Sequence, residues 1–171
     1  PRDDIAAAEA AVESALAIDR NHVLAHHVQG FLYRLRRQSV AAYEAFHSKI
    51  SLNPNFAPAH AQLGITQLEL GRPDLVGLSV QRAISLSPRD PSLGPWFAFL
   101  GMAALHSANY EEAIRWLGRA IKQGTPVARH HAYLASAFAL AGRLPEAQEA
   151  LSRFRASKPT ATISSLRTRA C

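Results

Sequence analysis

Small residues recur inside apolar, helix-forming segments of this chain, and their spacing constrains the fold more than any other feature. Gly30, Gly64, Gly101 and Ala135 follow one another at intervals of about 34 residues, with the middle interval three residues longer than the other two. A glycine inside a helix costs about 1 kcal/mol relative to alanine, so its repetition needs a structural reason. Self-similarity at a fixed period of this length is the signature of a repeat array.

A second marker keeps the same spacing. The segments "SLNPN" at 51–55 and "SLSPR" at 85–89 are separated by the same interval as Gly30 and Gly64. Pro159 follows Pro88 by the interval that separates Ala135 from Gly64. The same three extra residues appear in both series, so one insertion near 91–95 accounts for the offset in each.

Each repeat divides into two helices joined by a turn. In the second repeat, the pattern predicts helices over about 57–70 and 75–86, with Gly71 and Pro73 between them and Asp74 as the cap of the second helix. The segments "HSANYEEAI" and "LAGRLPEAQ" show the same turn later in the chain.

A helix–turn–helix unit of about 34 residues with these markers resembles the tetratricopeptide repeat. The resemblance covers nearly the whole chain and implies an all-α fold, a right-handed superhelical solenoid of antiparallel helix pairs. The expected organisation begins with the second helix of a truncated preceding repeat (1–22) and a first repeat (23–56). A second repeat with its insertion (57–93), a third repeat (94–127) and a fourth repeat (128–161) follow. The last segment is the start of a C-terminal capping helix or tail (162–171).

The first repeat departs from the family pattern at two positions. Gln29 replaces the usual leucine at position 7 of the unit, and Lys49 replaces the usual alanine at position 27. We expect this repeat to pack less tightly than the others.

The resemblance also implies a binding surface, because the first helix of each repeat lines a concave face in this family. Here that face is mostly apolar, and an apolar groove suits an amphipathic helix or an extended apolar segment of a partner protein. The predicted centre is Phe31, Ile65, Leu68, Met102 and Leu105. The full set of predicted partner-binding residues is Leu24, His27, Phe31, Leu35, Ile65, Leu68, Met102, Leu105 and Leu140.

Two other kinds of binding compete with this interpretation. The groove could instead be filled by another part of the parent protein or by a second copy, which would make the chain a self-assembly module. The net charge of +6 suggests a nucleic-acid-binding repeat, but the arginines are scattered and the inner helices carry mainly Leu, Ala and Phe. The lysine and asparagine with which some family members grip a chaperone's carboxylate are also missing.

No constellation of residues predicts catalysis, a metal site or a cofactor. His26, His60 and His131 take the same position of different repeats, a whole repeat apart, so they cannot converge on one ion, and a half-buried ring that packs the hairpin explains them. The acidic residues are sparse, and no glycine-rich phosphate loop or nucleophile elbow occurs. We therefore expect a protein that is not an enzyme.

The remaining sequence features concern compartment and origin. No run of 18 apolar residues predicts a membrane span, and the single cysteine, Cys171, agrees with a reducing, cytoplasmic compartment. Because the chain lacks a starting methionine and begins in the middle of a repeat, we expect it to be part of a longer protein.

A narrower resemblance concerns that parent. The segments "ALAIDRNHVLAHHVQGFLYR", "LNPNFAPAHAQLGI" and "TISSLR" look like the repeat regions that follow the catalytic domain of some bacterial adenylate or guanylate cyclases. Similar regions follow the winged-helix domain of some transcriptional regulators. This resemblance implies a regulatory or oligomerising module of a larger bacterial protein.

Overall fold

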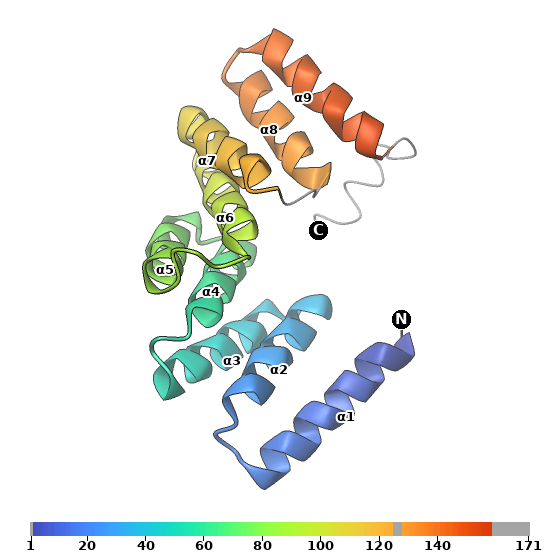
Figure 1. Ribbon diagram of the computed structural model, residues 1–171, viewed down its shortest axis with the longest axis vertical. Coiled ribbons are helices and arrows are strands. Elements are labelled where there is room, and N and C mark those ends of the chain that lie inside the picture. Colours follow the sequence, from blue (N-terminus) through green and yellow to red (C-terminus); the bar gives the residue numbers. More distant parts are fainter. Residues whose placement is uncertain (1, 125–127, 159–171) are drawn as a thin grey trace. The chain divides into compact units, whose positions relative to one another are not determined.

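The computed structural model describes residues 2–124 and 128–158, and within these residues the chain is all-α, as predicted (Figure 1). The described residues do not include the predicted C-terminal capping helix or tail at 162–171. They also do not include Thr125 and Pro159, which take the place of Pro88 in the third and fourth repeats. The helices are α1 (Arg2–Ile18), α2 (Val23–Leu35), α3 (Ser39–Leu52), α4 (Ala57–Glu69), α5 (Pro73–Leu86), α6 (Leu93–His106), α7 (Tyr110–Lys122), α8 (Ala128–Leu140) and α9 (Leu144–Ser157).

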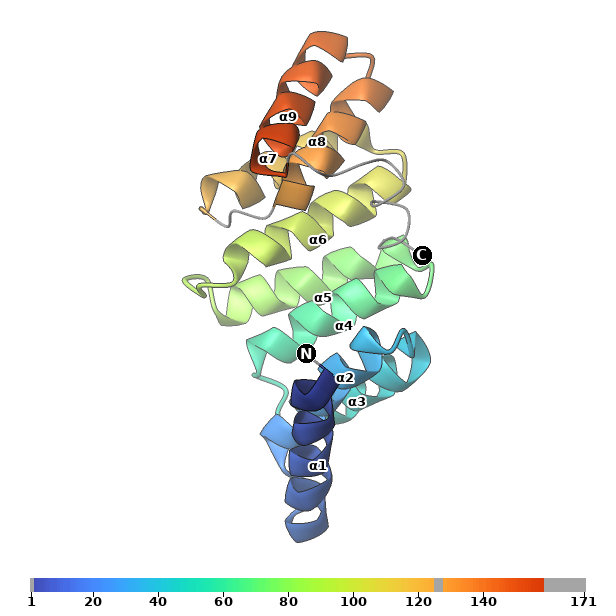
Figure 2. The same ribbon diagram turned by 90° about the vertical axis from the view of Figure 1, so that its right-hand side faces the viewer.

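The chain forms two compact units, Pro1–Asp90 and Pro91–Cys171. In the first unit α2 pairs with α3 and α4 with α5, while α1 packs on α2 and α3 on α4. In the second unit α6 pairs with α7 and α8 with α9, and α7 packs on α8. The short connections make each pair antiparallel (Figures 1 and 2). The helix-pair architecture predicted from the period is thus present in both units.

The recurring glycines lie where the two helices of a pair approach most closely. A Cβ atom added at any of three glycines would come within 2.6 Å of a side-chain carbon on the partner helix. Phe46 faces Gly30, Val80 faces Gly64 and Leu117 faces Gly101, each at the same position of its repeat. The closeness explains why the chain tolerates the cost of glycine in these helices.

The turn inside the second repeat differs from the prediction by one or two residues. The first helix, α4, ends at Glu69, and α5 begins at Pro73 with Arg72 as the preceding cap residue. Proline suits the first helical position because its fixed φ is already helical. Asp74 is therefore not the cap: it lies in the first turn, where its carboxylate pairs with the Arg72 guanidinium at 2.9 Å.

Two of the equivalent histidines tie a helix to the connection before it. His26 and His60 are half-buried, and the Nε2–H group of each donates to a backbone carbonyl six residues earlier, at 2.8 Å. The acceptors, Arg20 and Pro54, are themselves one repeat apart. The repetition of this bond supports a structural role for these rings.

Candidate functional site

An apolar ridge runs along the exposed face of α2. It is formed by four side chains with spacings of four, three and four residues, which place them on one face of a helix. We call this ridge the α2 stripe: Leu24, Val28, Phe31 and Leu35, which are 58%, 39%, 37% and 66% exposed. Three of these residues were predicted from the family register. Val28 was missed, although its helical spacing from Leu24 and Phe31 was a signal that could have found it.

A cleft of about 320 Å³ lies beside the stripe, between α1 and α2. Small or short side chains form its α1 wall, and Leu24 and Val28 belong to its α2 wall. The lining residues are Ala8, Ala11, Val12, Ala15, His22, Leu24, Ala25 and Val28. The alanines let another chain come close to the α1 backbone.

The next repeat along the chain shows which kind of element packs at the equivalent place. Moving one repeat along the chain maps the α1 wall onto a set of α3 residues that are all buried: Ala42, Ala45, Phe46 and Lys49. In that repeat, α2 lies over these α3 residues. Its Gly30 contacts Phe46 of α3, and its Arg34 hydrogen-bonds to Gln62 of α4 at 2.7 Å. The cleft between α1 and α2 therefore has the surroundings that, one repeat later, enclose a helix.

The other predicted binding residues differ in how much surface they offer. Ile65 and Leu68 on α4 are only 4% and 9% exposed, so little of either is open to a partner. Met102 and Leu105 on α6 and His27 on α2 are half-buried, while Leu140 at the end of α8 is mostly exposed. Among the predicted residues of the first unit, the accessible ones are those of the α2 stripe.

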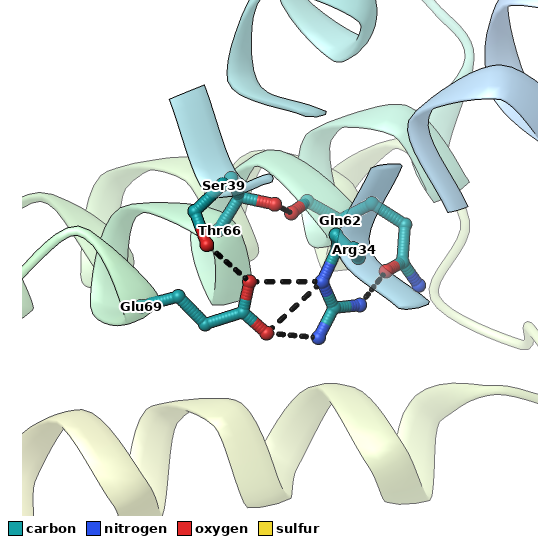
Figure 3. A network of polar contacts seen from close by, with 5 residues as sticks. All are labelled: Arg34, Ser39, Gln62, Thr66 and Glu69. Carbon is teal, nitrogen blue, oxygen red and sulfur yellow. Dashed lines mark hydrogen bonds and ion pairs between the residues drawn. The ribbon is translucent and has the colours of Figure 1, made fainter. Parts of the chain in front are cut away.

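A polar network joins the first repeat to the second beside this stripe (Figure 3). The Arg34 guanidinium donates to both carboxylate oxygens of Glu69, with its shortest bond at 2.5 Å, and to Gln62 Oε1 at 2.7 Å. Ser39 Oγ donates to the same carboxylate at 3.4 Å. The bidentate geometry fixes α4 against α2.

Beneath the stripe, a buried lysine lies in a group of aromatic rings. Lys49 is 0% exposed, and its Nζ atom lies 3.4 Å from the centre of the Phe56 ring. The His27 ring packs edge-on against Phe31, Phe46 and Phe56, with centroids 4.9, 5.8 and 5.2 Å away. Although lysine is unusual at this position, the first repeat encloses the side chain, because aromatic faces attract the ammonium group and shield it.

This environment changes the protonation of both basic groups. Burial lowers the pKa of Lys49 to about 8, and Nζ has no hydrogen-bond partner among the described residues. Burial, together with the charge of Lys49, lowers the pKa of His27 to about 4. His27 is thus neutral near pH 7 and contributes a ring, rather than a charge, to the surface beneath the stripe.

Replacing Lys49 with methionine is expected to stabilise the protein by roughly 1–3 kcal/mol at pH 7, because the variant buries no ammonium group. The unfolded chain holds the lysine proton up to about pH 10.5 and the folded chain only to about pH 8. The unfolded state therefore binds more protons between these values, and wild-type stability rises through that window. The gap between Lys49→Met and wild type should shrink from pH 7 to pH 10.5.

Urea unfolding followed by circular dichroism at both pH values measures this gap. Lys158→Met, which removes an exposed lysine, is the matched control and should leave stability nearly unchanged. A gap for Lys49→Met that is equally large at both pH values would contradict the assignment to a buried charge.

In the part of the chain that the structure describes, no group of three or more His, Cys, Asp or Glu side chains is placed to hold a metal ion. None of the described helices has the length and apolarity needed to cross a membrane.

The fold, in contrast to the sequence, has clear counterparts. No family model and no curated protein sequence matches the chain. The structure of PilW, a widely conserved type IV pilus biogenesis factor, has a TM-score of 0.86 at 22% identity over 96% of this chain and 74% of PilW. YrrB, a TPR protein with an unusual peptide-binding site, has a TM-score of 0.69 at 19% identity over 99% of this chain and 85% of YrrB.

A third structure points the same way. MamA 41-end from Desulfovibrio magneticus RS-1 has a TM-score of 0.73 at 15% identity, over 87% of this chain and 82% of the MamA chain in that structure. These likenesses show the fold: the helix pairs are arranged as in the tetratricopeptide-repeat fold.

Proposed function

We propose that this chain, which has the tetratricopeptide-repeat fold, is a non-catalytic scaffold that binds a helix of a partner protein along the α2 stripe and in the α1–α2 cleft. One observation carries the proposal: the α1 residues that line the cleft are equivalent, one repeat later, to buried α3 residues against which α2 packs. A surface built like an occupied helix site is suited to receive a helix, and another part of the parent protein is the alternative to a partner protein as its source.

The surface also defines the helix that fits it. The partner helix needs an apolar face to cover Leu24, Phe31 and Leu35, and a small residue where it crosses Val12. Val12 corresponds to Phe46, against which Gly30 packs. In this proposal Ile65 and Leu68 support the surface from within, while Met102, Leu105 and Leu140 form a second apolar contact area in the second unit.

The fold comparisons support the general class of function. YrrB is described as having a peptide-binding site, and PilW as a biogenesis factor. Both descriptions fit a scaffold that works through protein contacts, which is the role proposed for this chain.

Site-specific photo-crosslinking tests the proposal. A photoreactive residue at Leu35 should crosslink to the partner, whereas the same residue at Leu78, which is 77% exposed on α5, should not. Peptide mapping should place the crosslink in an amphipathic helix of the partner. Equal crosslinking from both positions would overturn the proposal.

A second copy of the chain is the alternative partner, and the spacing of the stripe favours it as the second candidate. Apolar residues at four-, three- and four-residue steps also form the seam between two packed helices. Light scattering after size-exclusion chromatography distinguishes the cases. A dimer that Leu35→Glu converts to a monomer supports self-assembly, and a monomer at micromolar concentration supports binding to a different protein.

We further propose that the chain is a regulatory module of a larger bacterial, cytoplasmic protein that carries a cyclase or winged-helix domain. The support for this parent is the sequence style of three segments. The full-length gene tests it directly, because it encodes such a domain or does not.

A further inference from the structure

The third repeat shows how an indole ring is held in this fold. Trp116 on α7 stacks on the buried Phe97 ring of α6, with centroids 5.6 Å apart and planes 25° from parallel. The Arg119 guanidinium carbon lies 4.3 Å from the centre of Phe97 and 4.9 Å from that of Trp116. Trp116 Nε1–H donates to Glu112 Oε1 at 3.2 Å, and the other oxygen of Glu112 accepts from Asn109 at 2.8 Å.

The fourth repeat keeps these surroundings but lacks the ring. The equivalents one repeat later are Arg143 for Asn109, His131 for Phe97, Glu146 for Glu112, Arg153 for Arg119 and Ala150 for Trp116. The stacking ring, the acceptor and the cation are thus present as residue types, and an alanine stands in place of the tryptophan.

A cavity of about 300 Å³ lies at this place, within α7, α8 and α9 of the second unit. His131, Glu146, Ala150 and Arg153 all line it, so the equivalents of the stacking ring, the acceptor, the tryptophan itself and the cation meet there. The rest of its lining is mostly apolar: Gly118, Ile121, Leu134 and Phe138, with Lys122 and Glu149.

We propose that this cavity binds the side chain of a tryptophan from a partner polypeptide. In the third repeat the ring enters as a side chain while its backbone stays in a helix outside the space. A tryptophan of a polypeptide reproduces that arrangement, whereas a free amino acid has no helix backbone outside the cavity.

The charges of the cavity match an indole ring. Arg143 donates two hydrogen bonds to Glu146 Oε1, at 2.9 and 2.6 Å, and a third to Glu111 Oε2 at 3.3 Å. The second oxygen of Glu146 then corresponds to the oxygen of Glu112 that accepts from the indole N–H. Arg153 pairs with Glu149 through the edge of its guanidinium, and a guanidinium paired at its edge keeps its faces for a ring.

The His131 side chain contributes an uncharged ring to the cavity wall. Burial, with a smaller contribution from the charge of Arg153, lowers the pKa of His131. The imidazole is therefore neutral near pH 7, and it offers a stacking face in the position that Phe97 takes in the third repeat.

Isothermal titration with N-acetyl-L-tryptophanamide tests the inference on the intact chain. We expect saturable binding with Kd on the order of 1 mM, as befits a single side chain, and no binding of N-acetyl-L-leucinamide. Free L-tryptophan should bind no more tightly than the amide. Equal binding of the leucine compound would mean an unselective apolar cavity, and tighter binding of free tryptophan would mean an amino-acid site; both outcomes overturn the proposal.

Two variants sharpen the test. Ala150→Trp should fill the cavity from within, raise Tm and abolish binding of the amide. Arg153→Ala, which leaves the fold intact because the side chain is exposed, should weaken binding about 3–10-fold. Arg155→Ala, exposed on the same helix and outside the cavity, is the matched control and should change nothing.

Binding in this cavity is independent of the proposed α2 surface, so Leu35→Glu should leave binding of the amide unchanged. Wild-type protein that shows no saturable binding would overturn the proposal, as would Arg153→Ala binding as tightly as wild type.

Discussion

Gly64→Ala should lower the free energy of unfolding by about 1–3 kcal/mol, even though alanine is the better helix former. The added Cβ would lie 2.6 Å from Val80 Cγ2. Val80 is fully buried, and valine is stiff at χ1, so it cannot turn away from the clash. The two helices of the pair must then separate, and this loss of packing outweighs the gain in helix propensity.

Gly77→Ala is the matched control, in α5 of the same unit. A Cβ at Gly77 meets no atom within 4 Å, so this variant should gain about 0.5–1 kcal/mol from reduced flexibility of the unfolded chain. Urea unfolding of both variants, followed by circular dichroism, measures the difference. If both substitutions stabilise the protein alike, the close approach of α4 and α5 is not what selects glycine at position 64.

Replacing Leu24 and Leu35 together with glutamate should weaken partner binding about 100-fold or more, because truncating a central contact costs about 2 kcal/mol or more. Both leucines are more than half exposed, so the double variant should fold normally. The readout is the affinity for the partner identified by crosslinking, or the dimer dissociation constant if the partner is a second copy.

Leu78→Glu provides the comparison, since it places a glutamate at a leucine of α5 that is more exposed than either of these two. It should leave affinity within about two-fold of wild type, as expected of a position outside the interface. Equal losses from the two variants would show that added charge, rather than loss of the stripe, reduces binding. Undiminished affinity in the double variant would exclude the α2 stripe as the binding surface.

The sequence predicted the parts of the fold that depend on periodicity. The helix pairs follow from the spacing of the repeat, and the same spacing marked Gly30, Gly64 and Gly101 as positions that needed a structural reason. Register also assigns each residue to a face of its helix. It does not say how much neighbouring side chains cover that face, and for this reason Ile65 and Leu68 were placed at the surface but are nearly buried.

The features that the sequence did not reveal bring together residues from several elements. Lys49 was recognised as unusual, but its aromatic surroundings come from α2, α3 and the connection before α4. The cavity at Ala150 had a signal that was available: Trp116 stands at the same position one repeat earlier. That signal is a difference between two repeats, a tryptophan in the third and an alanine in the fourth, whereas the fold was predicted from what the repeats share.

The bond between Arg34 and Glu69 carries a further consequence for the order of the repeats. Position 12 of the four repeats holds Arg34, Leu68, Leu105 and Ala139, and position 13 holds Leu35, Glu69, His106 and Leu140. Only the first repeat followed by the second brings an arginine to a glutamate. Hairpins with similar backbones are prone to pair with the wrong neighbour during folding. If another hairpin took the place of the second, the mostly buried Arg34 guanidinium would lose its carboxylate partner. The pair therefore favours the correct order of the first two repeats over a misassembled one.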